Sequence, residues 1–312
     1  MRAVGGAPTP LLRIYQAGTT LLGPIVYGRV GRKLRRQGVD ERRVGEKMGY
    51  ATLPRPPGRL IWFHAASVGE SLSVLTLIRR LGDRLADAEF LITSGTATSA
   101  RLVEARIPPR TRHQFAPLDI PGSVERFYDH WRPAAGIFVE SELWPNLLMQ
   151  GRKSGVPLAL VNARLSEKSV QGWKRWPDTT RQVLNGFSVM LTQNRRVADN
   201  LVAMGADPAR VRVSVNLKST SDPLPVDRVV LDQIRKNLGG RPVWIASSTH
   251  PGEEEQVLDA HRTLLDAQPE LCLVLVPRHP DRGSEVADLM QRAGLTFARR
   301  SMDQSITRNT PV

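Results

Sequence analysis

The residues best suited to chemistry lie in short loops, the first of which is residues 64–70, between an apolar run and a helical pattern. Its small residues allow a ligand to approach the backbone, and Glu70 stands where the loop enters the helix. A carboxylate at this place can act as a general base toward a substrate hydroxyl. The alternative is an acid that complements the helix dipole, a common structural role. Taken alone, these residues favour the structural role.

Two further loops follow later apolar runs. Residues 93–98 place hydroxyls and Gly95 ahead of a helical pattern, which suits either anion binding or ordinary capping at the helix N-terminus. Residues 140–146 place Glu140 and Glu142 beside a tryptophan and Pro145. Two acids at a strand end indicate a site. The structural alternative is that Glu142 caps a helix with Pro145 in its first turn.

The last third of the chain contains two loops that suit a phosphate. Ser248 and Thr249 lie between an apolar run and a helical pattern, so a phosphate could bind there at the helix N-terminus. Arg278 and His279 follow the next apolar run, where a nucleotide lies in parallel α/β sheets. Arginine suits phosphate because its planar guanidinium donates paired hydrogen bonds. A charged surface turn explains the same residues, so both interpretations stay open.

Several catalytic signatures do not occur in the sequence. There is no GxxxxGK[ST], HExxH or GxSxG, and no GxGxxG at the first strand. The 6 histidines show no close metal-ligand spacing, so we expect no metal site. Cys272 is the single cysteine, which excludes a disulfide scaffold and a cysteine-rich zinc site and favours a reducing compartment.

The elements that must position these loops alternate along the chain. Strand-like and helix-like segments follow each other from residue 59, which predicts βαβ units and a parallel sheet covered on both faces. Prolines and small polar residues at 219–227 predict a linker. The pattern restarts after it, with strands at 243–247 and 271–276 and a further one at 296–299. In the first part the expected strands are 60–64, 90–94, 136–140, 157–162, 189–193 and 211–215.

The positive charge is concentrated near the start of the chain. The 312 residues carry a net charge of +14, and residues 1–50 supply ten basic and three acidic side chains, a balance of +7. An anionic partner follows: nucleic acid, an acidic membrane surface or a phosphorylated substrate. Nucleic acid is the least favoured, because aromatic residues are 5% and no zinc-finger or RNA-binding motif accompanies the charge. We expect no nucleic-acid partner.

Residues 11–27 form the most apolar stretch near the start, and five basic residues follow within 29–36. As a helix this stretch spans roughly 26 Å, short of the ~30 Å hydrocarbon core, and it contains Arg13 and Pro24. A transmembrane span is not supported. An amphipathic anchor beside anionic lipid and a first helix packed on the protein body explain the pattern equally well.

Seven motifs occur in one order across the chain: FHAASVGE, TSGTATS, ESELWPNL, VNARLS, NLK, ASSTHPGEEE and PRHPDR. In combination they resemble the bacterial 3-deoxy-D-manno-octulosonic acid (Kdo) transferases, over roughly residues 11–300. The resemblance implies an α/β fold of the GT-B type, with two Rossmann-like domains that face a cleft. It also implies a lipid A precursor (lipid IVA) as acceptor, CMP-Kdo as donor, the cytoplasmic face of the inner membrane as location, and no metal or other cofactor.

The resemblance also implies roles for single residues. Glu70 matches the general base, which deprotonates the acceptor hydroxyl while that oxygen attacks the anomeric carbon of Kdo; CMP leaves and the configuration inverts. Glu140 and Lys218 match transition-state stabilisers, and a lysine suits developing phosphate charge. Arg278 and His279 match part of the CMP site, to which the phosphate-suited Ser248 and Thr249 add a further candidate pair.

The sequence also departs from the family pattern. Val215 stands where a glycine usually precedes Asn-Leu-Lys, and family members continue beyond residue 312 with further CMP-binding segments. We therefore expect a membrane-associating segment at 1–50, an acceptor-side domain at 51–218, the linker, and an incomplete donor domain at 228–312. An inactive, truncated member that retains only membrane or acceptor binding is the first alternative. Another GT-B or nucleotide-sugar enzyme is the second. The sequence does not indicate an oligomeric state.

Overall fold

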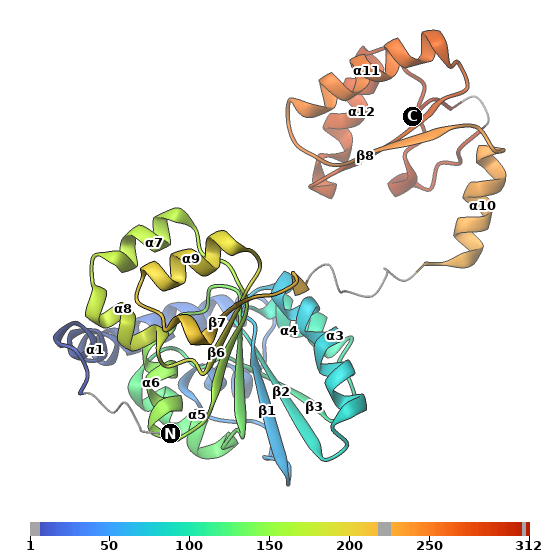
Figure 1. Ribbon diagram of the computed structural model, residues 1–312. Coiled ribbons are helices and arrows are strands. Elements are labelled where there is room, and N and C mark those ends of the chain that lie inside the picture. The colour runs from blue at the N-terminus through green and yellow to red at the C-terminus, as the bar shows by residue number, and fades with distance from the viewer. Residues whose placement is uncertain (1–6, 218–225, 308–309) are drawn as a thin grey trace. The chain divides into compact units, whose positions relative to one another are not determined.

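The computed structural model describes residues 7–217, 226–307 and 310–312. The chain divides into two compact units between residues 222 and 223, and each is described by itself (Figure 1). Residues 7–50 belong to the first unit. Lys218 and most of the expected linker lie outside the described residues.

The first unit is built on a parallel seven-stranded sheet with the order β3-β2-β1-β4-β5-β6-β7 (Figure 1). The order reverses between β1 and β4, so these two strands are neighbours although two other strands separate them in sequence. The strands are β1 Arg59–His64, β2 Ala88–Ser94, β3 Thr111–Phe115, β4 Ala135–Val139, β5 Leu158–Ala163, β6 Val189–Thr192 and β7 Val211–Val213.

The central strands are buried on both faces, as expected for a parallel sheet between two helical layers. In β1, Trp62 lies in a large core with residues of α5, α6, α8 and α9, whereas Ile61 and Phe63 pack against α3 on the other face. The helices of this unit are α1 Pro10–Arg36, α2 Glu41–Val44, α3 Val68–Arg84, α4 Ala97–Glu104, α5 Pro121–Trp131, α6 Pro145–Lys153, α7 Glu167–Lys174, α8 Pro177–Leu184 and α9 Arg195–Ala203, with 3-10 turns η1 Gly45–Met48 and η2 Pro208–Arg210.

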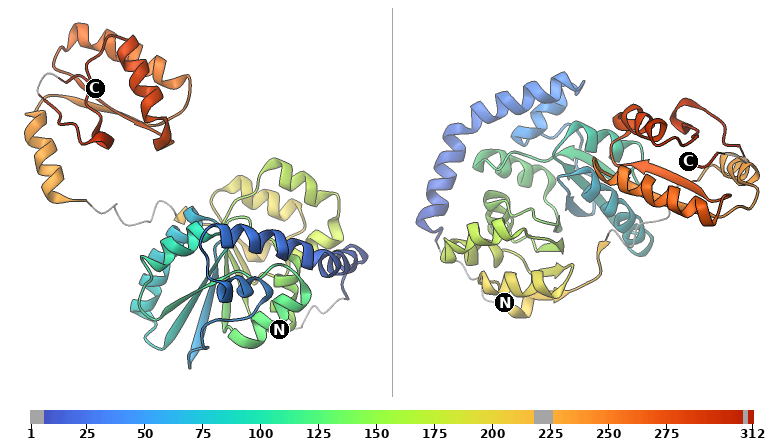
Figure 2. Two further views of the ribbon diagram at one scale, coloured as in Figure 1. Left: turned by 180° about the vertical axis from the view of Figure 1, so that it is seen from behind. Right: turned by 90° about the horizontal axis from the view of Figure 1, so that it is seen from above.

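Helix α1 joins the expected apolar stretch and the basic residues behind it in one helix. It begins at Pro10 after Thr9, whose hydroxyl accepts from Leu12 N, and it packs beside α2 and α5 (Figure 2). Few of its side chains are buried, Leu12 and Leu34 among them. Among the helices that the structure describes, none combines the length and the apolar character needed to cross a membrane.

The second unit contains the parallel pair β8 (Val243–Thr249) and β9 (Cys272–Pro277). Its core gathers Leu258, Leu273 and Val286. The strand expected at 296–299 does not form: Ala298 N donates to Val312 O, and Pro311 O accepts from Leu273 N instead. The remaining elements are helices α10 Arg228–Leu238, α11 Glu253–Ala267 and α12 Gly283–Arg292, and 3-10 turns η4 Pro280–Arg282 and η5 Arg300–Met302.

Candidate active site

The reversal of strand order between β1 and β4 defines where a ligand is expected in the first unit. In open α/β sheets, ligands bind beyond the carboxyl ends of the strands at such a point. His64, the last residue of β1, is in register with Thr93 of β2 and with Phe138 of β4. The loops 64–70, 93–98 and 140–146 therefore leave the sheet at the same edge, although they are far apart in sequence.

Glu70 lies in the first turn of α3 and is buried, with 7% of its surface exposed. Its Oε1 accepts from Ser67 Oγ at 2.7 Å and its Oε2 accepts from Ala66 N at 2.9 Å. Burial raises the pKa of Glu70, and the negative charges of Glu142 and Glu140 raise it further against these two hydrogen bonds. A carboxylate with a raised pKa is better suited to accept a proton near neutral pH. Glu70 thus combines the helix-start role with the character of a base.

Glu140 and Glu142 follow β4 in the neighbouring loop. Glu140 has a left-handed backbone (φ 60°), which is rare for a residue with a side chain and occurs at functional sites. Glu142 lies 3.4 Å from His64 Nε2 and accepts from the Trp144 indole N–H. Burial acts to raise the pKa of Glu142, but His64 and Trp144 outweigh it and leave the pKa below its ordinary value. In this site the pKa of Glu70 is therefore raised, whereas that of Glu142 is lowered.

Lys47 supports the Glu70 loop, and the sequence analysis did not identify it as a site residue. Its side chain is buried, and Nζ donates to Gly95 O at 3.1 Å and lies over the Phe115 ring. Gly95 N donates to Ala66 O at 3.2 Å, and a side chain at Gly95 would meet that same oxygen at 3.0 Å. Since Ala66 N in turn holds Glu70, a chain of contacts runs from Lys47 to the carboxylate.

This chain of contacts predicts the effect of Lys47→Met. The substitution keeps an unbranched side chain but removes the bond to Gly95 O, and a bond to a charged group contributes about 1.5–3 kcal/mol. We expect amide hydrogen exchange at residues 64–70 to become at least about tenfold faster, measured by mass spectrometry. Lys153→Met, at an exposed lysine, is the control and should leave this segment unchanged. Equal exchange in Lys47→Met and the native chain would contradict the prediction.

The beginning of the chain is only partly a free basic surface. Lys47 is buried, Arg35 pairs with Glu41, and Arg43 pairs with the buried Glu46. These three cations therefore do not form a basic patch in the way their sequence positions indicated. Among the remaining basic residues of α1, those with exposed side chains include Arg29, Arg32, Lys33 and Arg36.

Asp119, in the loop before α5, ties the acidic loop (residues 140–146, with Glu140 and Glu142) to α1. Helix α6 has no side-chain cap of its own, and Asp119 caps it from outside, accepting from Asn146 N at 3.0 Å and from Leu147 N at 2.8 Å. The same carboxylate accepts from Tyr15 Oη of α1 at 2.9 Å. Burial raises the pKa of Asp119, while these hydrogen bonds oppose the shift.

The residues just before the predicted Lys218 lie near the carboxyl end of β5. Lys218 lies outside the described residues, but Leu217 N donates to Asn162 Oδ1 at 3.1 Å, so the chain reaches the carboxyl end of β5 just before it. Asn162 also has a left-handed backbone (φ 56°). Glu140 N donates to Val161 O in the same region.

In the second unit the four predicted phosphate-site residues lie at the ends of two paired strands. Arg278 N donates to Thr249 O at 3.0 Å, which joins the loop after β8 to the loop after β9. Arg278 and His279 are exposed, as is Ser248, whose φ is 62°. Thr249 is buried, so its hydroxyl is less accessible than the sequence indicated.

Arg282, the second arginine of the PRHPDR motif, has a structural role. Arg282 pairs with the buried Glu254 at 2.7 Å and with Glu285 at 2.8 Å. This leaves Arg278 as the more accessible guanidinium of the PRHPDR motif. Across the described ranges, no three or more His, Cys, Asp or Glu side chains are grouped as metal ligands.

Solved structures show a fold similar to that of this chain. A UDP-GlcNAc 2-epimerase from Neisseria meningitidis bound to UDP-GlcNAc matches 75% of this chain and 69% of its own, with a TM-score of 0.54 and 11% identity. A putative UDP-N-acetylglucosamine 2-epimerase from Listeria monocytogenes matches 76% of this chain and 66% of its own, with a TM-score of 0.52 and 13% identity. The expected α/β class and Rossmann-like fold of the GT-B type are confirmed.

Sequence comparison identifies the family within this class. The family model of 3-deoxy-D-manno-octulosonic-acid transferase (Kdo transferase) matches residues 42–221. A probable mitochondrial Kdo transferase from Arabidopsis thaliana is 35% identical over 95% of this chain and 67% of its own length, and the Kdo transferase of Rickettsia felis is 36% identical over 78% and 52%. The chain belongs to the Kdo transferase family, as the motifs predicted. It spans about half to two thirds of the length of these relatives.

Proposed function

We propose that this protein transfers Kdo from CMP-Kdo to a lipid A precursor, lipid IVA, and releases CMP. The observation that carries the proposal is Glu70: a buried carboxylate with a raised pKa at the reversal of strand order, inside the region that matches the Kdo transferase family. The proposed reaction belongs to lipopolysaccharide synthesis.

In the proposed mechanism, Glu70 accepts the proton of the acceptor hydroxyl as that oxygen forms a bond to the anomeric carbon of Kdo. The bond between this carbon and the phosphate oxygen breaks, its electron pair leaves with CMP, and the configuration at the carbon inverts. Glu140 and Lys218 would stabilise the transition state. Arg278 and His279, with Ser248 and Thr249, would bind CMP in the second unit, and no metal or other cofactor takes part.

We further propose that α1 attaches the protein to the cytoplasmic face of the inner membrane. Large apolar side chains of α1 are exposed, including Leu21 at 79% and Ile14 at 68%. The exposed basic residues at its C-terminal half can interact with anionic lipid, each contributing about 1 kcal/mol near the surface. This arrangement supports an interfacial helix rather than one packed wholly on the protein.

Incubation with CMP-Kdo and lipid IVA tests the proposed activity. Release of CMP together with a Kdo-bearing lipid supports it, and the mass of the product gives the number of Kdo residues transferred. Lipid binding without product would point to a binding protein of the same family. A modified soluble sugar would point to another nucleotide-sugar enzyme.

The charge of Glu142 predicts a shift in the pH profile. Activity should fall as the pH drops through the pKa of Glu70, because only the carboxylate can accept the proton. Glu142 raises that pKa, so Glu142→Gln should lower it and move the acidic limb of kcat/KM to lower pH. Profiles between pH 4 and 9 measure the shift (roughly the range over which carboxylates and histidines titrate). Glu285→Gln, in the second unit, is the control, and an unmoved limb in Glu142→Gln would contradict the prediction.

A further inference from the structure

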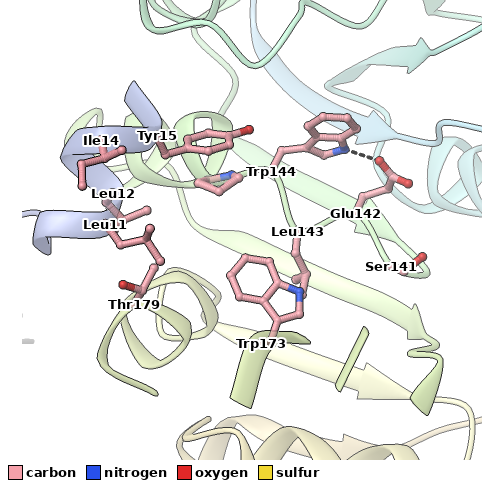
Figure 3. Close-up of a pocket in the computed structure, with 11 residues that line it drawn as sticks. Leu11, Leu12, Ile14, Tyr15, Ser141, Glu142, Leu143, Trp144, Trp173 and Thr179 are labelled. Carbon is pink, nitrogen blue, oxygen red and sulfur yellow. Dashed lines mark hydrogen bonds between the residues drawn. The ribbon is translucent and has the colours of Figure 1, made fainter. Parts of the chain in front are cut away.

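An apolar pocket of about 550 Å³ opens in the first unit beside the acidic loop (Figure 3). Helix α1 forms one wall with Leu11 and Ile14, the loop after β4 contributes Glu142 and Trp144, and Trp173 of α7 lies on the other side. The volume is within the usual range for small-molecule sites, about 300–1,000 Å³. Most of its lining is hydrocarbon or aromatic, which suits an apolar ligand rather than a nucleotide.

The walls of the pocket are held in place by contacts already described. Leu12 is buried in the main core, and Tyr15 is tied to Asp119, which also caps the helix after the acidic loop. Trp144 turns its indole N–H toward Glu142, away from α1 (Figure 3). These contacts fix the walls of the pocket, as expected of a largely pre-formed binding site.

The pocket connects the exposed face of α1 with the candidate active site. Ile14 and Trp144 are exposed, so the pocket opens to the surface on the side of α1. Glu142 belongs to the pocket lining and acts electrostatically on Glu70. A ligand whose tail lies in this pocket can therefore extend its other end toward the carboxylates.

We propose that this pocket holds one acyl chain of the lipid acceptor, an inference that rests on the proposed function. The acceptor is an amphiphile whose sugar must reach Glu70, and the pocket offers its tail an apolar site adjoining the carboxylate loop. The exposed cations Arg13, Lys174 and Arg175 are next to wall residues in sequence and suit a phosphorylated headgroup. This charge and the continuity with the apolar face of α1 favour a phosphorylated lipid over a neutral partner.

Binding of single-chain alkyl phosphates tests the pocket without any turnover. Octyl, decyl and dodecyl phosphate are titrated below their micelle concentrations by calorimetry. Each methylene buried contributes about 0.8 kcal/mol, so each should tighten binding about fourfold until the pocket is filled. Affinity that does not change with chain length would overturn the proposal.

Two variants of α1 separate the pocket from general membrane binding. Leu11→Glu introduces a charge into the half-buried lining and should abolish the chain-length dependence. Leu21→Glu, at an exposed position outside the lining, should weaken vesicle binding but keep the affinity for decyl phosphate. Circular dichroism verifies that both variants fold. Equal loss of decyl phosphate binding in both variants, or none in Leu11→Glu, would contradict the proposal.

Competition experiments identify the kind of lipid whose acyl chain occupies the pocket. Lipid IVA should displace decyl phosphate, whereas phosphatidylglycerol vesicles at equal lipid concentration should not. Equal displacement by both would assign the pocket to bulk membrane lipid and overturn the assignment to the acceptor. Self-association that Leu11→Glu abolishes, without decyl phosphate binding, would assign this face to a second copy of the chain.

Kinetics distinguish this inference from the proposed activity. In an active enzyme, Leu11→Glu should raise KM for lipid IVA about tenfold or more, with kcat and KM for CMP-Kdo unchanged, because burial of two methylenes alone changes affinity by about that factor. Turnover with an unchanged KM would overturn the pocket and leave the transferase proposal standing. If binding depends on chain length and lipid IVA displaces the alkyl phosphate, but no turnover occurs, the pocket assignment stands and the transferase proposal is overturned.

Discussion

Glu70→Gln is expected to slow Kdo transfer by about 10²–10⁴-fold, the usual contribution of general base catalysis. Glutamine has nearly the same shape, and its carbonyl oxygen can still accept from Ser67 Oγ or Ala66 N, the partners of the native carboxylate. It cannot accept the proton of the acceptor hydroxyl at neutral pH. The loss should therefore fall on kcat, with little effect on the affinity for CMP-Kdo.

The measurement is steady-state release of CMP at saturating acceptor, with donor affinity from calorimetry. Glu167→Gln is a matched control, because Glu167 also follows a serine N-cap in the first turn of a helix but is exposed. It should retain activity within about twofold, as is usual for a surface substitution. Full activity of Glu70→Gln would exclude Glu70 as the base and leave it the capping role that its hydrogen bonds show.

Asp119→Ala is expected to destabilise the first unit by about 3 kcal/mol. The carboxylate caps the N-terminus of α6 through two backbone N–H groups and also binds Tyr15. Loss of a cap costs about 0.5–2 kcal/mol, and each buried donor left without a partner adds about 1–3 kcal/mol. The loss of buried charge offsets part of this cost, since burial raises the pKa of Asp119. The acidic loop and α1 should loosen together.

Urea unfolding followed by tryptophan fluorescence measures this loss. Five of the six tryptophans lie before residue 177, so the signal reports mainly on the first unit. Tyr15→Phe, which removes one of the three bonds, should cost about 1 kcal/mol. Asp129→Ala, at an exposed position, should change stability by less than about 0.5 kcal/mol. If Asp119→Ala matches Asp129→Ala, the carboxylate does not hold α6 and α1 together.

Much of the fold could be predicted because burial leaves a periodic pattern in the sequence. The apolar run 60–64 differs from β1 by one residue, and the strand expected at 189–193 differs from β6 by one residue. By contrast, β3 (Thr111–Phe115) was missed, because its polar residues do not form an apolar run. Helix α3 begins at Val68, inside the expected loop 64–70, because Ser67 provides its cap. The prediction of a strand at 296–299 was wrong, because the local sequence pattern does not specify which strand it would pair with.

The loops of the candidate site could be located from sequence, but not the environment of their side chains. Glu70 was identified as a possible base, yet its residue type fits a helix start equally well. Its raised pKa depends on burial and on Glu142, which is 72 residues away in the chain. Lys47 was counted among the basic residues of a surface segment, whereas in the structure its side chain is buried and donates to Gly95 O.

By itself, the sequence therefore determined the family, the alternation of strands and helices, and the loops in which the chemistry would lie. Only the tertiary structure decided which of these loops meet, and with what effect on charge. The physical reason is that the spacing of apolar residues shows which side of a single strand or helix is buried. Which loops are neighbours depends instead on the order of the strands in the sheet. Burial in the folded unit raises the pKa of the proposed base, and placing β4 beside β1 brings the loop of Glu142 to the loop of Glu70, which raises that pKa further.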